Sequence, residues 1–177
     1  MDVAKTEKLL ESIFPEVIGA VITVDPSNMR VNLCPVNFQA ASTKYEHPLT
    51  VCLGLGNNSY TLKNILAHGQ FVYAYPSPGQ LKDVIYCGTV SGHKSNKLKD
   101  TKLQFAESTK VSPPNLQNAV INFECELQHS YIVGNFTLVV GLVKHIEGSL
   151  SETQKIYSLG GTKYGTVIID KVIQESR

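Results

Sequence analysis

The sequence predicts an α+β fold, mainly β, whose antiparallel strands form a sheet closed or nearly closed as a barrel. Short runs rich in Val, Ile, Phe and Tyr recur along most of the 177 residues, with turn residues between them. Two long runs, residues 119–133 and 136–148, meet at Gly134 and Asn135 like the arms of a hairpin. Segments with helical spacing are few and short, so helices can only flank such a sheet.

The first half of the chain predicts one helix followed by several strands. "KTEKLLESIF", residues 5–14, has apolar side chains at helical spacing, and Pro15 ends it. The turn "DPSN" and the polar stretch "KYEHP" then interrupt β-rich runs. The strands predicted here are residues 16–24, 31–33, 38–43, 49–54 and 70–75.

Three further helices are predicted between or after these strands. Residues 61–69 carry Leu62, Ile65 and Leu66 on one face, and Gly69 stands where a helix would end. Residues 79–86 and 95–100 are the other two, the last with Ser95 as its cap. No repeat, low-complexity tract or linker divides the chain, so a single domain over residues 1–177 is expected.

Charge and composition restrict the partners. Lys and Arg number 16 against 15 Asp and Glu, a net charge of +1, which argues against nucleic acid or an anionic membrane as a ligand. No apolar run reaches the ~20 residues of a membrane span, and the N-terminus lacks a signal-peptide pattern. We therefore expect a cytoplasmic protein. Its four cysteines, Cys34, Cys52, Cys87 and Cys125, are expected to be reduced and mostly buried.

No catalytic residue or metal site is evident from spacing. The five histidines lack zinc-ligand spacing, and Cys125 and His129, four apart, do not supply it. Glu124 and Glu126 alternate with apolar residues, which predicts a strand with one solvated face; an acid/base pair is the alternative. No phosphate-binding or dinucleotide-binding glycine motif occurs, so redox chemistry would need a borrowed reactive group.

The loop "LGLGNNSYT", residues 53–61, lies between a predicted strand and a predicted helix. Its Asn, Ser and Thr side chains could simply cap the helix. Alternatively, they could join backbone N–H groups at the positive end of the helix to bind a phosphate. The basic stretch "HKSNKLKDTK" is typical of a solvated face, although one member such as Lys97 could reach a phosphate.

Several segments taken together resemble the flavin reductase-like family of FMN-binding split β-barrels, which includes flavin reductases, ferric reductases and flavoredoxin. The likeness extends from about Val17 to Gly165. The segments that carry it, in the family's order, are "NLCPVNFQAAS", "HPLTVCLG", "NNSYTLKNILAHGQFVYAYPS", "YCGTVSGHKSNKL", "FECEL", "GNFTLVVGLV" and "YSLGGTKYG".

The resemblance implies an antiparallel Greek-key split barrel that forms a homodimer with FMN near the subunit interface. By position, one strand would lie along the flavin ring and ribityl chain, and the loop would hold the phosphate with help from Lys97. The ring strand comprises Gln39, Ala40, Ala41, Ser42 and Thr43, and the phosphate residues are Asn58, Ser59 and Thr61.

Two departures from the family pattern bear on activity. Many relatives place Arg or Lys in the phosphate loop, whereas this loop is uncharged. Flavin reductases tend to carry Gly-Asp-His where this chain has Gly134, Asn135 and Phe136, which puts reaction with a nicotinamide in question.

Three functions follow as hypotheses. The first is an FMN-dependent oxidoreductase with NAD(P)H as donor and a flavin, a ferric complex or a redox partner protein as acceptor. The second is an FMN-binding electron carrier without efficient NAD(P)H turnover. The third is a flavin-free barrel that binds another ligand or serves in assembly.

Overall fold

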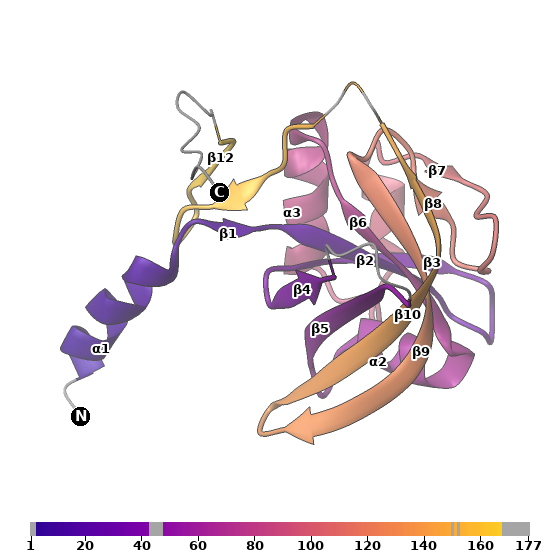
Figure 1. Ribbon diagram of the computed structural model, residues 1–177, viewed down its shortest axis with the longest axis horizontal. Coiled ribbons are helices and arrows are strands. Elements are labelled where there is room, and N and C mark those ends of the chain that lie inside the picture. The colour runs from indigo at the N-terminus through magenta and orange to yellow at the C-terminus, as the bar shows by residue number, and fades with distance from the viewer. Residues whose placement is uncertain (1–2, 43–47, 150, 152, 168–177) are drawn as a thin grey trace, which may run out of the picture.

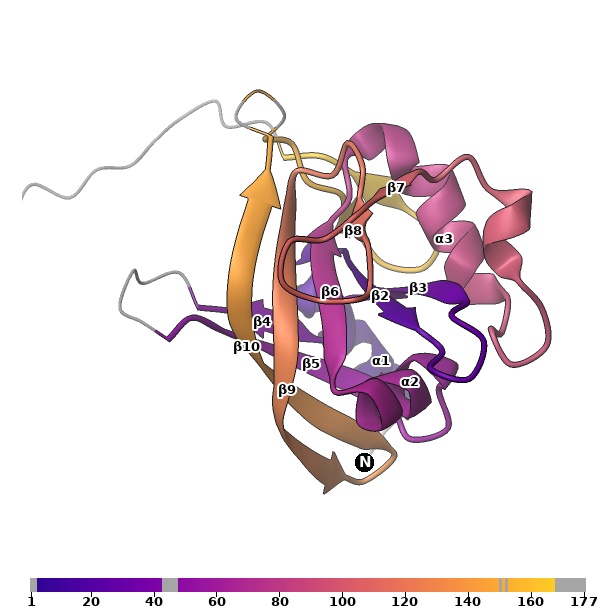
Figure 2. The same ribbon diagram turned by 90° about the vertical axis from the view of Figure 1, so that its right-hand side faces the viewer.

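The computed structural model describes residues 3–42, 48–149, 151 and 153–167. Its main sheet has seven antiparallel strands: β2 (Gly19–Val24), β3 (Val31–Val36), β4 (Gln39–Ala41), β5 (Thr50–Gly56), β6 (Gln70–Tyr75), β9 (Ile121–Val133) and β10 (Phe136–Gly148). Their order is β3-β2-β6-β9-β10-β5-β4, and the sheet curls into an open barrel (Figures 1 and 2). The predicted α+β, mainly β fold, a Greek-key split barrel with few short helices, is confirmed.

Smaller elements surround this barrel. Two minor sheets consist of β1 (Glu16–Val17), β11 (Tyr157–Ser158) and β12 (Tyr164–Gly165), and of β7 (Phe105–Ala106) and β8 (Asn115–Leu116). The helices are α1 (Val3–Leu10), α2 (Tyr60–His68) and α3 (Leu81–Thr89), with 3₁₀ turns η1 (Glu11–Ile13), η2 (Pro78–Gln80) and η3 (Lys97–Asp100). Figure 1 shows α1 standing away from the barrel at the end of β1.

The predicted helix at residues 95–100 is wrong in type. It is the 3₁₀ turn η3, and Ser95 does not cap it: Asn96 is the residue before it, without a capping side-chain hydrogen bond. Only Leu98 in this segment is apolar, so an α-helix there would have no face to bury.

Apolar clusters cover both faces of the central strands, so β2 is buried along its whole length. On one face, Ile22 and Val72 pack with Val84 of α3. On the other, Phe71 and Val139 pack with Leu62 and Ile65 of α2 in a second cluster. This second cluster fixes α2 against the barrel and therefore fixes where its N-terminus lies.

The ends of α2 agree with the sequence pattern. The Ser59 hydroxyl accepts a hydrogen bond from the backbone N–H of Leu62 at 3.1 Å, so Ser59 is the N-cap. Gly69 ends the helix with φ of 77°, a left-handed conformation that glycine adopts without steric cost. Ser59 in the loop "GNNSYT" thus caps α2. At a capped N-terminus, the first backbone N–H groups of the helix have no hydrogen-bond acceptor inside the helix.

Two predictions about exposure are corrected. Cys52 is exposed on β5, because its side chain points to the outer face, whereas Cys87 and Cys125 are buried as expected. Glu124 was predicted on a solvated strand face but is fully buried, since the segment before β8 folds over it. The backbone N–H groups of Thr109 and Lys110 both donate to its carboxylate.

Hydrogen bonds determine the charge state of this buried carboxyl. Burial raises the pKa of Glu124, but the N–H of Thr109, the amide of Asn115 and the N–H of Lys110 outweigh it and hold the pKa below its usual value. Glu126, by contrast, does lie on the solvated side, where it pairs with Lys144 at 3.3 Å. The two carboxylates therefore do not form an acid/base pair.

Candidate functional site

The loop between β5 and α2 borders a hollow of about 510 Å³. Two basic side chains reach it, Lys63 from the first turn of α2 and His93 from the segment after α3. The lining residues are Asn57, Asn58, Ser59, Leu62, Lys63, Leu66 and His93. Helix geometry also leaves the N–H groups of Tyr60 and Thr61 without intrahelical acceptors beside Ser59. A positive helix end with two basic side chains nearby can bind an anion such as a phosphate.

The β9–β10 hairpin fastens this loop through Asn57. The backbone N–H of Asn57 donates to the carbonyl of Asn135 at 3.1 Å, and its side-chain amide donates to the carbonyl of Gly134 at 3.0 Å. The Thr137 hydroxyl donates to Asn57 Oδ1 at 2.9 Å. The turn of the long hairpin and the phosphate-loop candidate therefore form one unit.

Phe136, the residue that departs from the family's Gly-Asp-His, lies next to this unit and outside the core. Its side chain is 46% exposed, and its ring meets the edge of Phe38 at 6.1 Å. The Phe38 ring covers Gly54, where a Cβ atom would lie only 2.1 Å from it. Gly54 of β5 thus allows the close approach of an aromatic ring.

Tyr60 connects the start of α2 to the segment that carries His93. Its hydroxyl donates to Asp25 and accepts from Arg30, whose guanidinium also donates to the carbonyl of Gly92 at 2.6 Å. The rings of Tyr60 and His93 meet edge to face at 4.9 Å. Gly92 lies so close to Tyr60 that a Cβ would come within 2.4 Å of its ring. This network positions His93 at the hollow.

Asp25 supports that network in its ionised form. Hydrogen bonds from the side chain of Ser27, from Tyr60 and from the backbone of Ser27 hold its pKa far below the usual value. Burial and the hydrogen bond to Asp25 raise the pKa of Tyr60. A carboxyl with a lowered folded-state pKa stabilises the fold above its unfolded-state pKa, and this contribution is lost as the pH falls through the folded-state value.

We therefore expect Asp25→Asn to destabilise the protein at pH 7 and to matter progressively less below about pH 3.9, where the unfolded-state carboxyl becomes protonated. Urea unfolding of the wild type and the variant at pH 7 and in steps down to about pH 3 measures this. A difference in unfolding free energy that stays constant over that range would contradict the assignment of the ionised form.

Two of the predicted phosphate residues are buried outside the hollow. Thr61 is 2% exposed, and its hydroxyl accepts from the amide of Asn32 on β3 at 3.0 Å. Lys97 is 5% exposed, and its Nζ donates to the carbonyl of Cys87. Burial lowers the pKa of Lys97. Neither residue lines the hollow, unlike Asn58 and Ser59.

The predicted ring strand lies beside the other end of β5. Ala41 and Ser42 line a second hollow, of about 410 Å³, with the aromatic rings of Tyr75 and Phe123 and with Lys155. The Tyr75 hydroxyl donates to Gln39 at 3.2 Å, Ala40 is exposed on β4, and Thr43 lies outside the described residues. The N–H of Ser42 donates to the carbonyl of Thr50, at the opposite end of β5 from Asn58, about 20 Å along the strand. Gln39, by contrast, pairs with Leu53 at the start of the loop, so the predicted ring strand begins near the loop and only its Ser42 end lies far from Asn58.

Some lining residues were missed from the sequence. Lys63 follows the Ser59 cap by four residues, a spacing that places it one turn along the same helix face, so the pattern contained a usable signal. The sequence shows His93 only as part of a basic run and gives no sign that it reaches the hollow. Lys155 lies with its Nζ 5.0 Å from the Tyr75 ring centroid. No pattern in the sequence around Lys155 indicates that it lines a hollow. Among the described residues, no helix is both long enough and apolar enough to span a membrane.

Comparison with known sequences identifies relatives. A sequence profile described as "Flavin reductase like domain" matches residues 13–166. A protein of Archaeoglobus fulgidus, named only "Uncharacterized protein", is 36% identical over 99 residues, which cover 56% of this chain and 56% of the relative. The chain spans about half the length of this relative and of a second one, from Pyrococcus abyssi.

Solved structures share the fold over nearly the whole chain. The 2-nitrobenzoate 2-nitroreductase NbaA of Pseudomonas fluorescens has a TM-score of 0.83 at 19% identity, covering 100% of this chain and 92% of its own. Flavoredoxin of Desulfovibrio vulgaris scores 0.79 at 18% identity, covering 92% and 91%. An FMN-binding protein from Thermus thermophilus scores 0.77 at 19% identity, covering 91% of each chain. At such identities the likeness establishes the fold.

Proposed function

We propose that this chain, which belongs to the flavin reductase like domain family, is an FMN-dependent oxidoreductase with the FMN phosphate bound at the start of α2. The observation that carries the proposal is the hollow beside Ser59, where Lys63 and His93 face a helix N-terminus. NAD(P)H is the proposed donor, and a flavin, a ferric complex or a partner protein is the proposed acceptor. The structural neighbour from Thermus thermophilus is an FMN-binding protein, which supports the choice of cofactor.

The residues present fit a phosphate. Backbone N–H groups at the first turn of α2 and the Lys63 ammonium supply donors, and His93 supplies a ring N–H. The buried Oδ1 of Asn32, which has no hydrogen-bond partner in the described part of the chain, faces Gly92 beneath the loop. Thr61 holds the amide of Asn32 through its hydroxyl, and Lys97 remains a proposed aid to phosphate binding.

FMN, when bound, supplies the hydride and electron chemistry, and the protein supplies binding and orientation. Asn57 ties the phosphate loop to the hairpin, so the loop is organised before ligand arrives. Gln39, Ala40, Ala41, Ser42 and Thr43 remain the proposed contacts of the ring and ribityl chain.

The test is the affinity for FMN compared with riboflavin, which lacks the phosphate. If N–H groups and Lys63 bind the phosphate, FMN should bind at least about tenfold more tightly, equivalent to ~1.4 kcal/mol. Fluorescence titration of each flavin measures both affinities. Equal affinities for FMN and riboflavin would contradict a phosphate site at the start of α2. If the protein binds neither flavin, the flavin-free barrel is favoured.

A second candidate function is an FMN-binding electron carrier that a partner protein reduces. The specific observation that favours it is Phe136, which cannot donate a hydrogen bond or carry charge where flavin reductases tend to have histidine. An electron carrier of this kind would bind FMN as the proposed oxidoreductase does, but NADH and NADPH would reduce the bound FMN slowly.

We further propose a homodimer that uses the tip of the β9–β10 hairpin. Figure 1 shows this hairpin extending beyond the barrel. Its tip exposes 55% of Tyr131, 80% of Ile132 and 56% of Val133 on the two faces of the strand, and the rings of Phe38 and Phe136 pack together nearby. Exposed apolar side chains grouped in this way are typical of an interface between protein subunits.

We expect Ile132→Asp to weaken the dimer by about 30-fold, since a buried charge at a hot spot costs ~2 kcal/mol. Met29→Asp is the control, because Met29 is 61% exposed but lies in a turn away from the hairpin. Light scattering over a concentration series measures the dissociation. A wild-type monomer of 19.4 kDa with FMN bound would contradict the dimer.

A further inference from the structure

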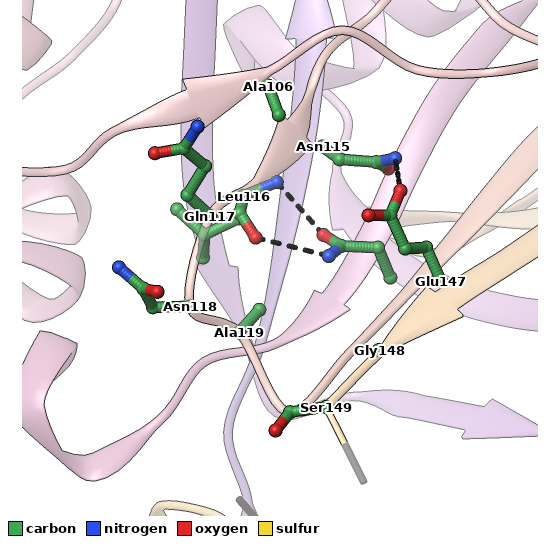
Figure 3. A pocket seen from close by; sticks show the side chains of 10 residues that line it. Ala106, Asn115, Leu116, Gln117, Asn118, Ala119, Glu147, Gly148 and Ser149 are labelled. Atoms are coloured by element: carbon green, nitrogen blue, oxygen red, sulfur yellow. Dashed lines mark hydrogen bonds between the residues drawn. The ribbon is translucent and has the colours of Figure 1, made fainter.

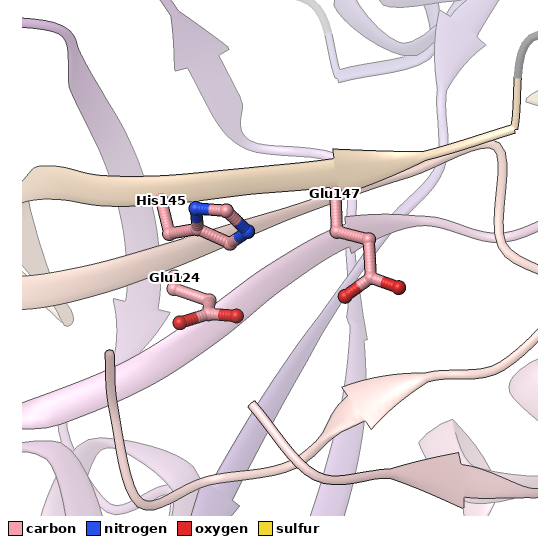
Figure 4. A group of neighbouring side chains, drawn as sticks. All are labelled: Glu124, His145 and Glu147. Atoms are coloured by element: carbon pink, nitrogen blue, oxygen red, sulfur yellow. The ribbon is translucent and has the colours of Figure 1, made fainter. Parts of the chain in front are cut away.

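A group of potential metal ligands lies on β9 and β10, apart from the loop hollow. Glu124 and His145 are opposite each other in the strand ladder, and Glu147 follows two residues along β10. One ligand atom from each of the three lies within 4.8 Å of the others, and Figure 4 shows the three side chains gathered on one side of the strands. Spacing along the sequence gave no sign of this group because two strands contribute to it.

The negative charge of this group lacks a Lys or Arg partner among the described residues. Glu124 is fully buried, and its three donors are the neutral N–H groups of Thr109 and Lys110 and the amide of Asn115. Between described residues, the sole ion pair is that of Lys144 with Glu126. Buried carboxylates are normally paired with a cation or bound to a metal. A carboxylate accepts about four hydrogen bonds, so one acceptor position of Glu124 remains.

Asn115 adds an independent observation. Its side chain is buried, with 2% exposed, and its Nδ2 donates to Glu124 and to Glu147, at 2.9 Å in each case. Its Oδ1 has no hydrogen-bond partner among the described residues. A buried carbonyl oxygen without a donor is costly, yet this one belongs to the amide that lies between the two carboxylates. In the structure Nδ2 and not Oδ1 faces the carboxylates, so the amide must turn over to present Oδ1 to a cation bound there.

We propose that Glu124, His145 and Glu147, with Asn115 Oδ1 as a fourth ligand, form a site for a divalent transition-metal ion such as Zn²⁺. An imidazole with carboxylates favours Zn²⁺ or a similar ion over Mg²⁺ and Ca²⁺, which prefer oxygen ligands alone. Ligand atoms about 2.1 Å from one ion can be no more than about 4.2 Å apart, so separations within 4.8 Å need at most a small movement of the exposed Glu147 to bind one ion.

A cavity of about 320 Å³ gives this site an opening to solvent. Glu147 and Asn115 line it together with Gln117, Asn118 and other polar residues (Figure 3). The ion would join the segment that carries Asn115, on β8, to strands β9 and β10. Binding should therefore stabilise this side of the barrel and does not depend on FMN.

The experiment uses the full chain after treatment with EDTA. Zn²⁺ is titrated in competition with a chromophoric chelator, and the melting temperature is recorded with and without Zn²⁺. We expect one ion per chain and a higher melting temperature. His145→Gln and Glu147→Gln should each weaken binding at least about tenfold and reduce the shift accordingly.

His129→Gln is the matched control, because His129 is an exposed histidine on β9 outside the group. It should bind as the wild type does. If His145→Gln and Glu147→Gln also bind Zn²⁺ as the wild type does, the ion lies elsewhere and the site is overturned. Absence of any binding by the wild type overturns it equally. Neither outcome bears on the flavin titrations, so this proposal and the proposed function fail separately.

Discussion

Replacing Lys63 by glutamine is expected to weaken FMN binding about tenfold or more while leaving riboflavin binding unchanged. A hydrogen bond from an ammonium to a phosphate contributes roughly 1.5–3 kcal/mol, which corresponds to about 10- to 150-fold in affinity. We expect the lower end, because Lys63 is exposed and water already solvates its ammonium. Glutamine retains a similar length and a donor but removes the charge.

Riboflavin is the internal control, since it lacks the group that Lys63 is proposed to contact. Lys82→Gln is the matched control variant, because Lys82 is an exposed lysine on α3 outside the hollow. Fluorescence titrations of both flavins with both variants measure the effect. An equal loss of FMN and riboflavin binding in Lys63→Gln would indicate damage to the fold around Tyr60, whose ring the ammonium approaches to 6.0 Å. No loss at all would place the phosphate elsewhere.

Local patterns sufficed for most of the fold. Runs rich in Val, Ile, Phe and Tyr between turn residues predicted the strands of the main sheet, and Asn135 next to Gly134 predicted the long hairpin turn, where Gly134 has a positive φ of 59°. The Asn, Ser and Thr residues of the loop and Gly69 predicted where α2 begins and ends, because caps depend on a few adjacent residues. These features need only local interactions.

The site depended on contacts that sequence spacing does not record. Lys97 was expected at the phosphate but is buried against the carbonyl of Cys87, since the chain after α3 turns back over β3. Glu124 was expected in solvent, yet the segment before β8 covers it. His93 reaches the hollow only because Arg30 and Tyr60 hold Gly92 in place. Each case is a tertiary contact that overrides a correct local pattern.

Sequence reasoning was most informative where a residue departs from the family pattern, as at Phe136. Its ring is half exposed and touches the edge of Phe38, the residue immediately before the proposed flavin strand. The alternative that Phe136 points into the core does not hold, so a polar replacement there should not unfold the barrel. The edge contact between the rings contributes about 0.5–1.5 kcal/mol, a tolerable loss.

Phe136→His is therefore expected to accelerate reduction of the bound flavin by NADH or NADPH, roughly tenfold to a hundredfold. A histidine at this position can donate a hydrogen bond and carry charge near neutral pH, whereas phenylalanine can only pack. One polar contact made only in the transition state contributes about 1–3 kcal/mol, which gives the stated range. Phe136→Leu is the control, since it removes the ring without adding a donor. Anaerobic stopped-flow absorbance measures the rates. An equal gain in both variants would show that relief of packing, and not the donor, causes it, and rapid reduction of the wild type would mean that Phe136 imposes no handicap.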